Sequence, residues 1–290
     1  MTVGVGTQIT DLTVHDHACL TFGESYELFD LTAAYVRDGL AGGLKVVWIS
    51  GAVPDQAMAE LSRRGIAVEP AMAAGQVAAA QGEGRLLSGR EFSSGNAMRW
   101  LRAEVAACRG AGFPGLRVAV DMSWALEPVS GVEQLPDFEQ ELGEAVADAA
   151  VSVLCQYDRE RFDPVTLATV SAFHTCSVAA ATYYCDPTLR ICRQYAPPGI
   201  RLAGEIDFKA EETLALALAE AIRIDGDITV NMDGLRFIDV ACVRKILDAA
   251  RAVPAPRRVI LECEPGIAAR FTLMGAGEIA GLSLVNVYVG

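Results

Sequence analysis

The sequence predicts an α/β protein of two domains, and three observations lead to that class. Its 290 residues exceed one ordinary domain and suffice for two. Hydrophobic residues make up 52% of the chain, enough to build a buried core. Short apolar runs alternate with amphipathic stretches, which is typical of a parallel sheet covered by helices on both faces.

The first part of the chain shows this alternation most clearly. KVVWIS at 45–50 and LRVAVD at 116–121 are apolar runs of strand length, and the second ends in a carboxylate. Residues 27–40 carry apolar side chains at helical spacing and stop before two glycines. In chain order we predict strand 18–22, helix 27–40, strand 45–50, helix 54–64, helix 95–108, strand 116–121, helix 138–149, strand 151–157 and helix 164–174.

A proline-rich segment marks the expected domain boundary. Positions 196–199 are Ala-Pro-Pro-Gly, which cannot continue a helix or a central strand. We therefore expect one domain over 1–195 and a smaller one over 200–290. The smaller one is predicted to contain strand 200–205, helix 210–221, strand 227–232, helix 239–251, strand 258–262, helix 266–274 and strand 284–287.

Composition excludes several classes of function. The chain holds 24 basic and 37 acidic residues, a net charge of −13. An acidic surface disfavours nucleic acid and anionic membranes as partners, because both need positive charge opposite their phosphates. The N-terminus lacks the features of a secretory signal, and no apolar run reaches the roughly 20 residues of a spanning helix. We expect a cytoplasmic protein.

Residues 200–290 resemble the STAS domain, the fold of bacterial anti-sigma-factor antagonists. The resemblance rests on GEID at 204–207, ITVNMDGLRFIDVACV at 228–243 and VILEC at 259–263. It implies an anti-sigma factor or a related regulatory protein as partner. The residues that it places on the partner-binding face are Asp207, Phe237, Asp239, Val240 and Arg244.

One position departs from the STAS pattern. Switchable members carry a phosphorylatable Ser or Thr after the Asp of FID, whereas this chain has Val240, which offers no hydroxyl. We therefore expect an unphosphorylatable domain. Asp239 also has a plain structural role, as a helix N-cap worth about 1 kcal/mol, and that role is compatible with a partner contact.

The first part carries HDHACL at 15–20, a long helix after it, KVVWI at 45–49 and LCQYD at 154–158. With these blocks, about residues 13–190 resemble the MEDS domain, a sensory domain of methanogen and methylotroph regulators. The resemblance implies a sensory, non-enzymatic role, and a homodimer is left open. YVRDGL at 35–40 and VVWIS at 46–50 carry a fainter likeness to RecA-type clock ATPases, which implies a RecA-like parallel sheet.

The phosphate loop of that RecA-type likeness is degenerate. A Walker loop needs GxxxxGK[ST], so that backbone amides and a lysine hold phosphates. The matching stretch at 22–27 is FGESYE, which lacks the lysine and adds two carboxylates. We expect no cofactor and no nucleotide hydrolysis. A residual nucleotide-binding or hydrolysing enzyme, with Asp121 in the Walker B position, is the alternative.

The carboxyl ends of parallel strands form a crevice where ligands bind in open α/β sheets. A small-molecule ligand would sit there, against residues that follow or end predicted strands. These candidates are His17, Phe22, Glu24, Asp121, Trp124 and Gln156. The alternatives are a crevice filled by its own side chains and, for Glu24, simple stabilisation of a helix start.

Histidine and cysteine patterns define no further site. His15 and His17 would form half a metal site if Cys19 or His174 joined them, but two ligands without a third at defined spacing are weak evidence, and we predict no metal. The eight cysteines include no CxxC pair. Some of those between 176 and 192 could sense oxidants, or they could be buried filler.

Overall fold

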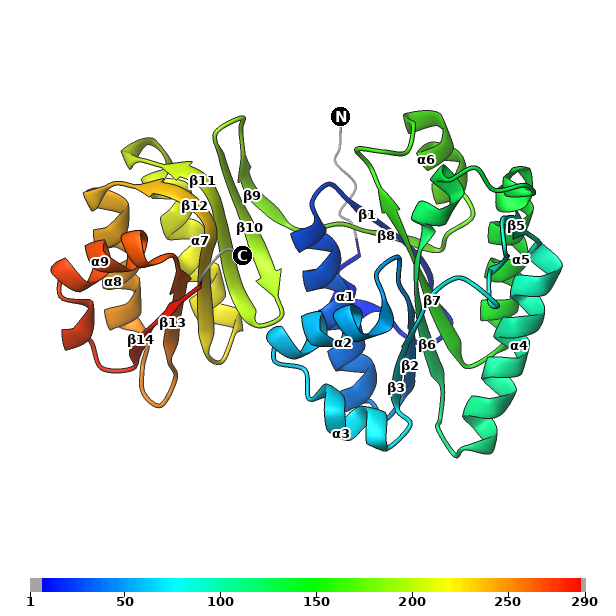
Figure 1. Cartoon of the computed structure of the whole chain (residues 1–290). Helices are drawn as coiled ribbons and strands as arrows, with labels where there is room; N and C mark the ends of the chain where they lie inside the picture. The colour runs from blue at the N-terminus through cyan, green and yellow to red at the C-terminus, as the bar shows by residue number, and fades with distance from the viewer. Residues whose placement is uncertain (1–6, 288–290) are drawn as a thin grey trace. The chain divides into compact units, whose positions relative to one another are not determined.

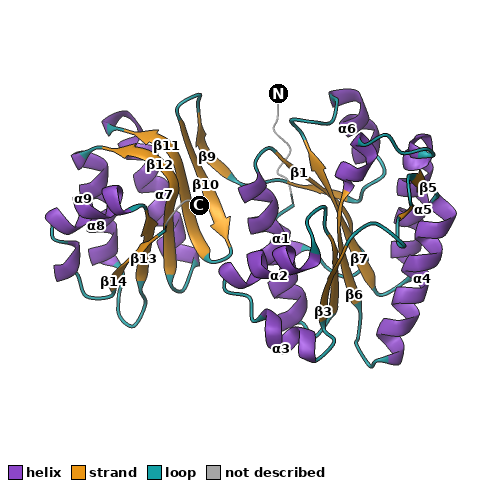
Figure 2. Cartoon of the chain, viewed as in Figure 1, coloured by secondary structure: helices purple, strands orange, loops and turns teal. Residues whose placement is uncertain are grey.

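The computed structural model describes residues 7–287 and divides into two compact units, Met1–Ala179 and Ala180–Gly290. Each unit is built around one six-stranded sheet with helices packed on it (Figures 1 and 2). This confirms the predicted α/β class, with a parallel sheet in the first unit and a mixed sheet in the second.

The N-terminal sheet is entirely parallel, with strand order β3-β2-β6-β7-β1-β8. Its central strands are nearly continuous runs of buried apolar residues, as expected of a sheet covered on both faces. The strands are β1 His17–Phe22, β2 Lys45–Ile49, β3 Val77–Ala80, β6 Leu116–Asp121, β7 Val151–Asp158 and β8 Cys176–Val178.

Helices cover both faces of this sheet (Figure 2). On one side lie α1 (Ser25–Ala41), α2 (Pro54–Arg63) and α3 (Val68–Ala73). On the other lie α4 (Ser94–Gly110) and α5 (Leu135–Asp148), followed in the chain by α6 (Pro164–Ser171). Their core joins Met98, Leu101, Phe138 and Leu142 of α4 and α5 to valines of β6 and β7.

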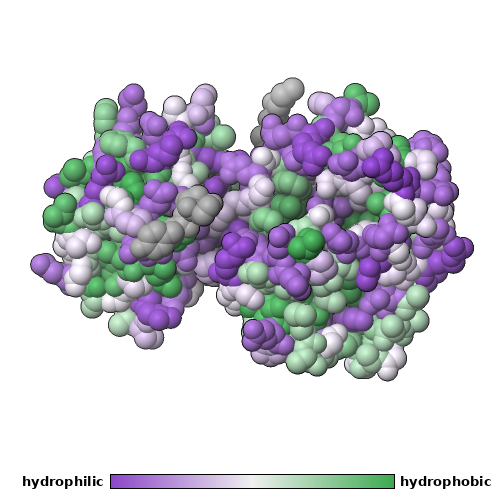
Figure 3. Space-filling model, in the orientation of Figure 1, coloured by the Kyte–Doolittle hydropathy of each residue, from purple (hydrophilic) through white to green (hydrophobic). Residues whose placement is uncertain are grey.

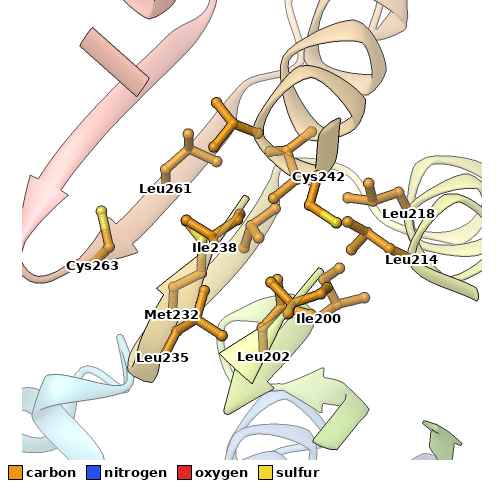
Figure 4. Packing of buried hydrophobic residues seen from close by; sticks show 14 of the residues in the cluster. Ile200, Leu202, Leu214, Leu218, Met232, Leu235, Ile238, Cys242, Leu261 and Cys263 are labelled. Carbon is orange, nitrogen blue, oxygen red and sulfur yellow. The ribbon is translucent and has the colours of Figure 1, made fainter. Parts of the chain in front are cut away.

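The C-terminal sheet has the order β14-β13-β12-β11-β10-β9. Strands β9 to β11 are antiparallel neighbours, and β11 to β14 are parallel. One apolar core lies between this sheet and its helices (Figure 4). The elements are β9 Thr182–Cys185, β10 Leu189–Tyr195, β11 Pro198–Ile206, α7 Glu211–Ile224, β12 Ile228–Ile238, α8 Val240–Ala252, β13 Val259–Cys263, α9 Pro265–Leu273 and β14 Leu282–Asn286.

The structure divides the chain earlier than positions 196–199. Those residues form the turn of the β10–β11 hairpin, inside the second unit, and the division falls between Ala179 and Ala180. Strands β9 and β10, which the sequence assigned to the first domain, pair with the C-terminal sheet instead. A Pro-Pro-Gly segment stops a strand equally well at a hairpin and at a linker, so it could not tell the two apart.

The predicted elements recur within a few residues of their expected bounds. The sequence missed α3, β3, β8, β9, β10 and the small hairpin of β4 (Leu87–Ser88) with β5 (Glu91–Phe92). Strand β12 also continues six residues past its expected end, with register shifts against β11 that accommodate the extra residues.

No helix within residues 7–287 is long and apolar enough to cross a bilayer. The face shown in Figure 3 mixes hydrophilic and hydrophobic side chains over both units.

Gly204 supplies a test of the C-terminal fold. Its φ is +98°, and a Cβ there would lie 2.0 Å from the carbonyl oxygen of Thr188. Gly204→Ala should lower the free energy of unfolding of this unit by about 1–3 kcal/mol, because both backbone and neighbour must shift. Urea denaturation followed by circular dichroism measures the change.

Gly266→Ala is the matched control, since no heavy atom lies within 4 Å of the added Cβ and the site opens α9. It should change stability by less than about 1 kcal/mol. All three tryptophans lie in the first unit, so their fluorescence separates the two unfolding events. A Gly204→Ala chain as stable as the wild type would contradict the described backbone.

Candidate functional site

A hollow of about 360 Å³ lies at the carboxyl edge of the N-terminal sheet, where β2, β3 and β6 end. This is the edge at which open parallel sheets bind ligands. The lining residues come from the ends of these strands and the loops that follow them. They are Ile49, Ser50, Gly51, Gln81, Gly82, Glu83, Leu87, Asp121, Ser123, Trp124 and Glu127.

Asp121 joins the loops on two sides of the hollow. Its Oδ2 accepts the backbone N–H of Gly51 at 3.1 Å, after β2. Its Oδ1 accepts the N–H and the hydroxyl of Ser123, at 2.9 and 2.6 Å. Any larger residue at position 51 would clash, because a Cβ there would lie 2.5 Å from Asp121 Oδ2. Asp121 therefore shapes the hollow as well as lining it.

Trp124 borders the hollow but offers it little of its ring. Its side chain is buried, and Phe92 stacks on it with ring centroids 4.4 Å apart. The indole Nε1 is buried and has no hydrogen-bond partner among the described residues. It is a donor that a ligand with an acceptor atom could satisfy.

The loop after β1 is filled by the protein's own charges. Glu27 Oε2 accepts the N–H of Gly23 at 2.7 Å and pairs with Arg159 Nη2 at 3.1 Å. The Arg159 guanidinium lies over Gly23, 2.5 Å from where a Cβ would be. An amide and a cation that could have held a phosphate are thus both used by Glu27.

Three of the six predicted ligand contacts are placed beside β1 and β7 and do not line the hollow. Phe22 is the buried end of β1, and Glu24 is the residue just before α1. Gln156 is buried in β7, where its Nε2 donates to Thr32 Oγ1 at 2.7 Å. Only Asp121 and Trp124 of the six are among the residues that line the hollow.

His17 is a correction, because it lies at the amino end of β1 and not at the carboxyl edge. Its ring is buried in a four-residue cluster with Glu139 of α5, Cys155 of β7 and His174, which follows α6. Each of these residues offers one nitrogen, oxygen or sulfur atom, and the four atoms all lie within 4.8 Å of one another. These are atom types that hold a metal ion.

Glu139 is the charged centre of this His–Glu–Cys cluster. Its Oε2 lies 3.0 Å from His17 Nε2 and 3.4 Å from His174 Nε2, and its Oε1 accepts the hydroxyl of Tyr157. Burial raises the pKa of the Glu139 carboxyl, but the hydrogen bond from His17, the two nearby imidazoles and the hydroxyl of Tyr157 together outweigh it and leave the pKa below its usual value. Glu139 is therefore an ionised carboxylate with no solvent contact.

His174 and Cys155 are held neutral. Burial lowers the pKa of His174 to about 4, and its Nδ1 donates to the carbonyl of Val170 at 2.8 Å. Burial and the nearby Glu139 raise the pKa of the Cys155 thiol well above its usual value. His17 and His174 were candidate ligands from the sequence, whereas Glu139 and Cys155 were not, because neither has a ligand-like spacing to the histidines.

Exposed apolar side chains gather where β11 and β12 end in the second unit. Phe208, Phe237 and Val240 are 65%, 43% and 63% exposed. Around them, Asp207 accepts the N–H of Lys209 and Asp239 caps α8 by accepting the N–H of Cys242 at 2.8 Å. The predicted N-cap role of Asp239 is confirmed.

Helix α8 has one buried and one exposed face. Val243 and Ile246 are buried against the sheet, whereas Val240 and Arg244 are exposed. Beside them is a hollow of about 240 Å³ bordered by Glu205, Asp207 and Phe237. We call Asp207, Phe208, Phe237, Val240 and Arg244 the α8 face.

Comparison with known proteins identifies the first unit. Residues 16–175 match the family model described as the methanogen/methylotroph, DcmR sensory domain, abbreviated MEDS. That span is more than half of the chain. The chain belongs to the MEDS family. The match covers the MEDS domain and does not reach the C-terminal unit.

Two further comparisons complete this result. No curated protein matches the chain. A KaiC-like protein of the hyperthermophilic archaeon Pyrococcus horikoshii is similar in structure, with a TM-score of 0.47 and 13% sequence identity. The similarity covers 63% of this chain and 79% of that one.

Asp121→Asn tests how the MEDS hollow is built. The carboxylate accepts three hydrogen bonds, and an amide must turn its NH₂ toward the N–H of Gly51 or of Ser123. We expect a loss of about 1–3 kcal/mol in the free energy of unfolding. Urea denaturation followed by tryptophan fluorescence measures it, since Trp124 lies beside the site.

Glu127→Gln is the control, because Glu127 lines the same hollow with its side chain 65% exposed. Its effect should stay within about 0.5 kcal/mol. Equal stabilities of the two variants would show that Asp121 does not hold these loops.

Proposed function

We propose that this chain is a non-enzymatic signalling regulator. Its MEDS domain binds a small ligand, and its C-terminal unit is a STAS-like domain that docks an anti-sigma factor or a related regulatory protein. The family match supports the sensory part. The observation that carries the output part is Val240, an apolar side chain 63% exposed at the first turn of α8.

The lining of the MEDS hollow suggests the chemistry of the ligand. Glu83, Asp121 and Glu127 place three carboxyl groups there, and no lining residue is basic. Ile49, Leu87 and Trp124 add apolar surface. A neutral or cationic molecule with an apolar part fits this lining, whereas a phosphate or carboxylate would be repelled.

The STAS-like assignment of the second unit rests on its sequence pattern and on the α8 face. GEID ends β11 and begins the turn capped by Asp207, and FID ends β12 and caps α8 through Asp239. GEID is followed by the exposed Phe208, whereas FID begins with the exposed Phe237 and is followed by the exposed Val240. Val240 is an exposed apolar residue at the position where switchable STAS domains carry a phosphorylatable hydroxyl. This favours a domain that can dock its partner at all times, without control by phosphorylation.

The rival function is a residual nucleotide hydrolase of RecA-like descent. It would need the loop after β1 to hold phosphates. Glu27 already accepts the Gly23 amide and pairs with Arg159, so a nucleotide would have to displace that ion pair and face its carboxylate. We therefore favour the regulator.

The purified protein should neither bind MgATP nor hydrolyse it. The reason is the absence of a loop lysine and the occupation of the loop by Glu27 and Arg159. Calorimetric titration with MgATP and a phosphate-release assay measure the two properties. Turnover that is lost in the Asp121→Asn chain would contradict the proposal and support the hydrolase.

Val240→Asp should abolish docking of the partner. A carboxylate buried at an apolar contact costs about 2 kcal/mol or more, so affinity should fall at least about thirtyfold. The measurement is the dissociation constant of each host anti-sigma factor, purified as a panel, for wild type and variant. Circular dichroism checks that the fold is intact.

Leu273→Asp is the matched control, because Leu273 is 87% exposed at the last residue of α9. Helix α9 starts beside the carboxyl end of β13 and runs back along the sheet, so its last residue lies away from that edge. It should leave affinity unchanged. If the partner binds wild type and Val240→Asp equally well, the α8 face is not the interface.

A further inference from the structure

The His–Glu–Cys cluster has the dimensions of a tetrahedral metal site. Bonds of about 2.0–2.3 Å to nitrogen, oxygen and sulfur place the ligand atoms roughly 3.3–3.6 Å apart. Glu139 Oε2 lies 3.0 Å from His17 Nε2, 3.4 Å from His174 Nε2 and 3.6 Å from Cys155 Sγ. Cys155 Sγ lies 3.6 Å from His17 Nε2.

His174 already has the protonation that a metal ligand needs. The carbonyl of Val170 can only accept, so the proton of His174 sits on Nδ1 and the lone pair of Nε2 faces the cluster. That Nε2 is fully buried and has no hydrogen-bond partner among residues 7–287. A lone pair opposite a carboxylate oxygen repels it unless a cation lies between them.

Tyr157 supports such a site from outside. Its hydroxyl donates to Glu139 Oε1, which leaves Oε2 to face the two histidines and Cys155. Outer hydrogen bonds of this kind orient a ligand carboxylate in metal sites.

We propose that His17 Nε2, Glu139 Oε2, Cys155 Sγ and His174 Nε2 bind one Zn²⁺ ion. Binding forms four coordinate bonds, moves the proton of His17 from Nε2 to Nδ1, which has no hydrogen-bond partner among the described residues, and releases the Cys155 thiol proton to solvent, with no change in oxidation state. The charge of the ion is then cancelled by one carboxylate and one thiolate, so the loaded site is neutral, as a buried site requires. With four protein ligands it is a closed site, of the structural kind.

This site is separate from the ligand hollow and goes beyond the proposed function. Its four ligands come from the amino end of β1, from α5, from β7 and from the segment before β8, which is the last strand of the first unit. Zinc would therefore stabilise the MEDS domain whether or not that domain is a sensor.

The test uses the full chain carrying Cys176→Ser and Cys185→Ser, which removes the half-buried and exposed thiols as background ligands. After treatment with a chelator, the protein is titrated with Zn²⁺ and, separately, with Co²⁺. We expect one Zn²⁺ per chain by elemental analysis, a higher melting temperature and a thiolate-to-cobalt charge-transfer band.

Adding Cys155→Ser should remove the band, and adding Cys108→Ser, at a buried cysteine outside the cluster, should keep it. Tyr157→Phe retains all four ligands and should weaken zinc binding about ten- to hundredfold. This variant and the wild-type spectrum keep the test informative if Cys155→Ser fails to fold. A chain that takes up no zinc, or a band that survives Cys155→Ser in folded protein, would overturn the proposal.

Discussion

The first unit depends on how it compensates one buried charge. Glu139 is ionised with no exposure to solvent, and an uncompensated charge in such a place would cost several kcal/mol. Its partners come from β1, β7 and the segment after α6, so α5 cannot move from the sheet without breaking them. The same arrangement brings two imidazoles and a thiol around a single carboxylate oxygen.

Charged side chains therefore have different roles at the two edges of the N-terminal sheet. At the carboxyl edge, Glu27 and Arg159 neutralise each other in the loop where a RecA-type ATPase would hold phosphate. Asp121 is engaged by backbone and hydroxyl donors, and the hollow that it shapes retains an acidic lining. These contacts favour a binding module over a hydrolase, because the groups that phosphate chemistry needs are already paired with the protein.

Local features of the sequence predicted most of the fold. Strands such as LRVAVD at 116–121 and helices that end at a glycine depend on residues close to them in the sequence. They therefore appear where the sequence predicted them. Strand β3 was missed because its VAAA sequence carries a weak strand preference. The domain boundary was misplaced because the proline turn at 196–199 could belong to a hairpin or to a linker.

The sites were less predictable, because they depend on residues that are distant in the chain. Asp121 and Trp124, which line the hollow, could be predicted because they end or closely follow a strand that the sequence predicts. The His–Glu–Cys cluster forms only when β1 pairs with β7 and α5 packs on the sheet. No spacing rule in the sequence connects its four residues. Helix α8 exposes Val240 and Arg244, two of the residues that the STAS resemblance placed on the partner-binding face.

In the proposed site, a zinc ion balances the charge of Glu139. Anomalous diffraction at the zinc absorption edge, from crystals of the full chain grown with zinc, tests it most directly. We expect one strong peak in the first unit, at bonding distance from all four side chains of the cluster. A map with no peak there would contradict the proposed zinc site.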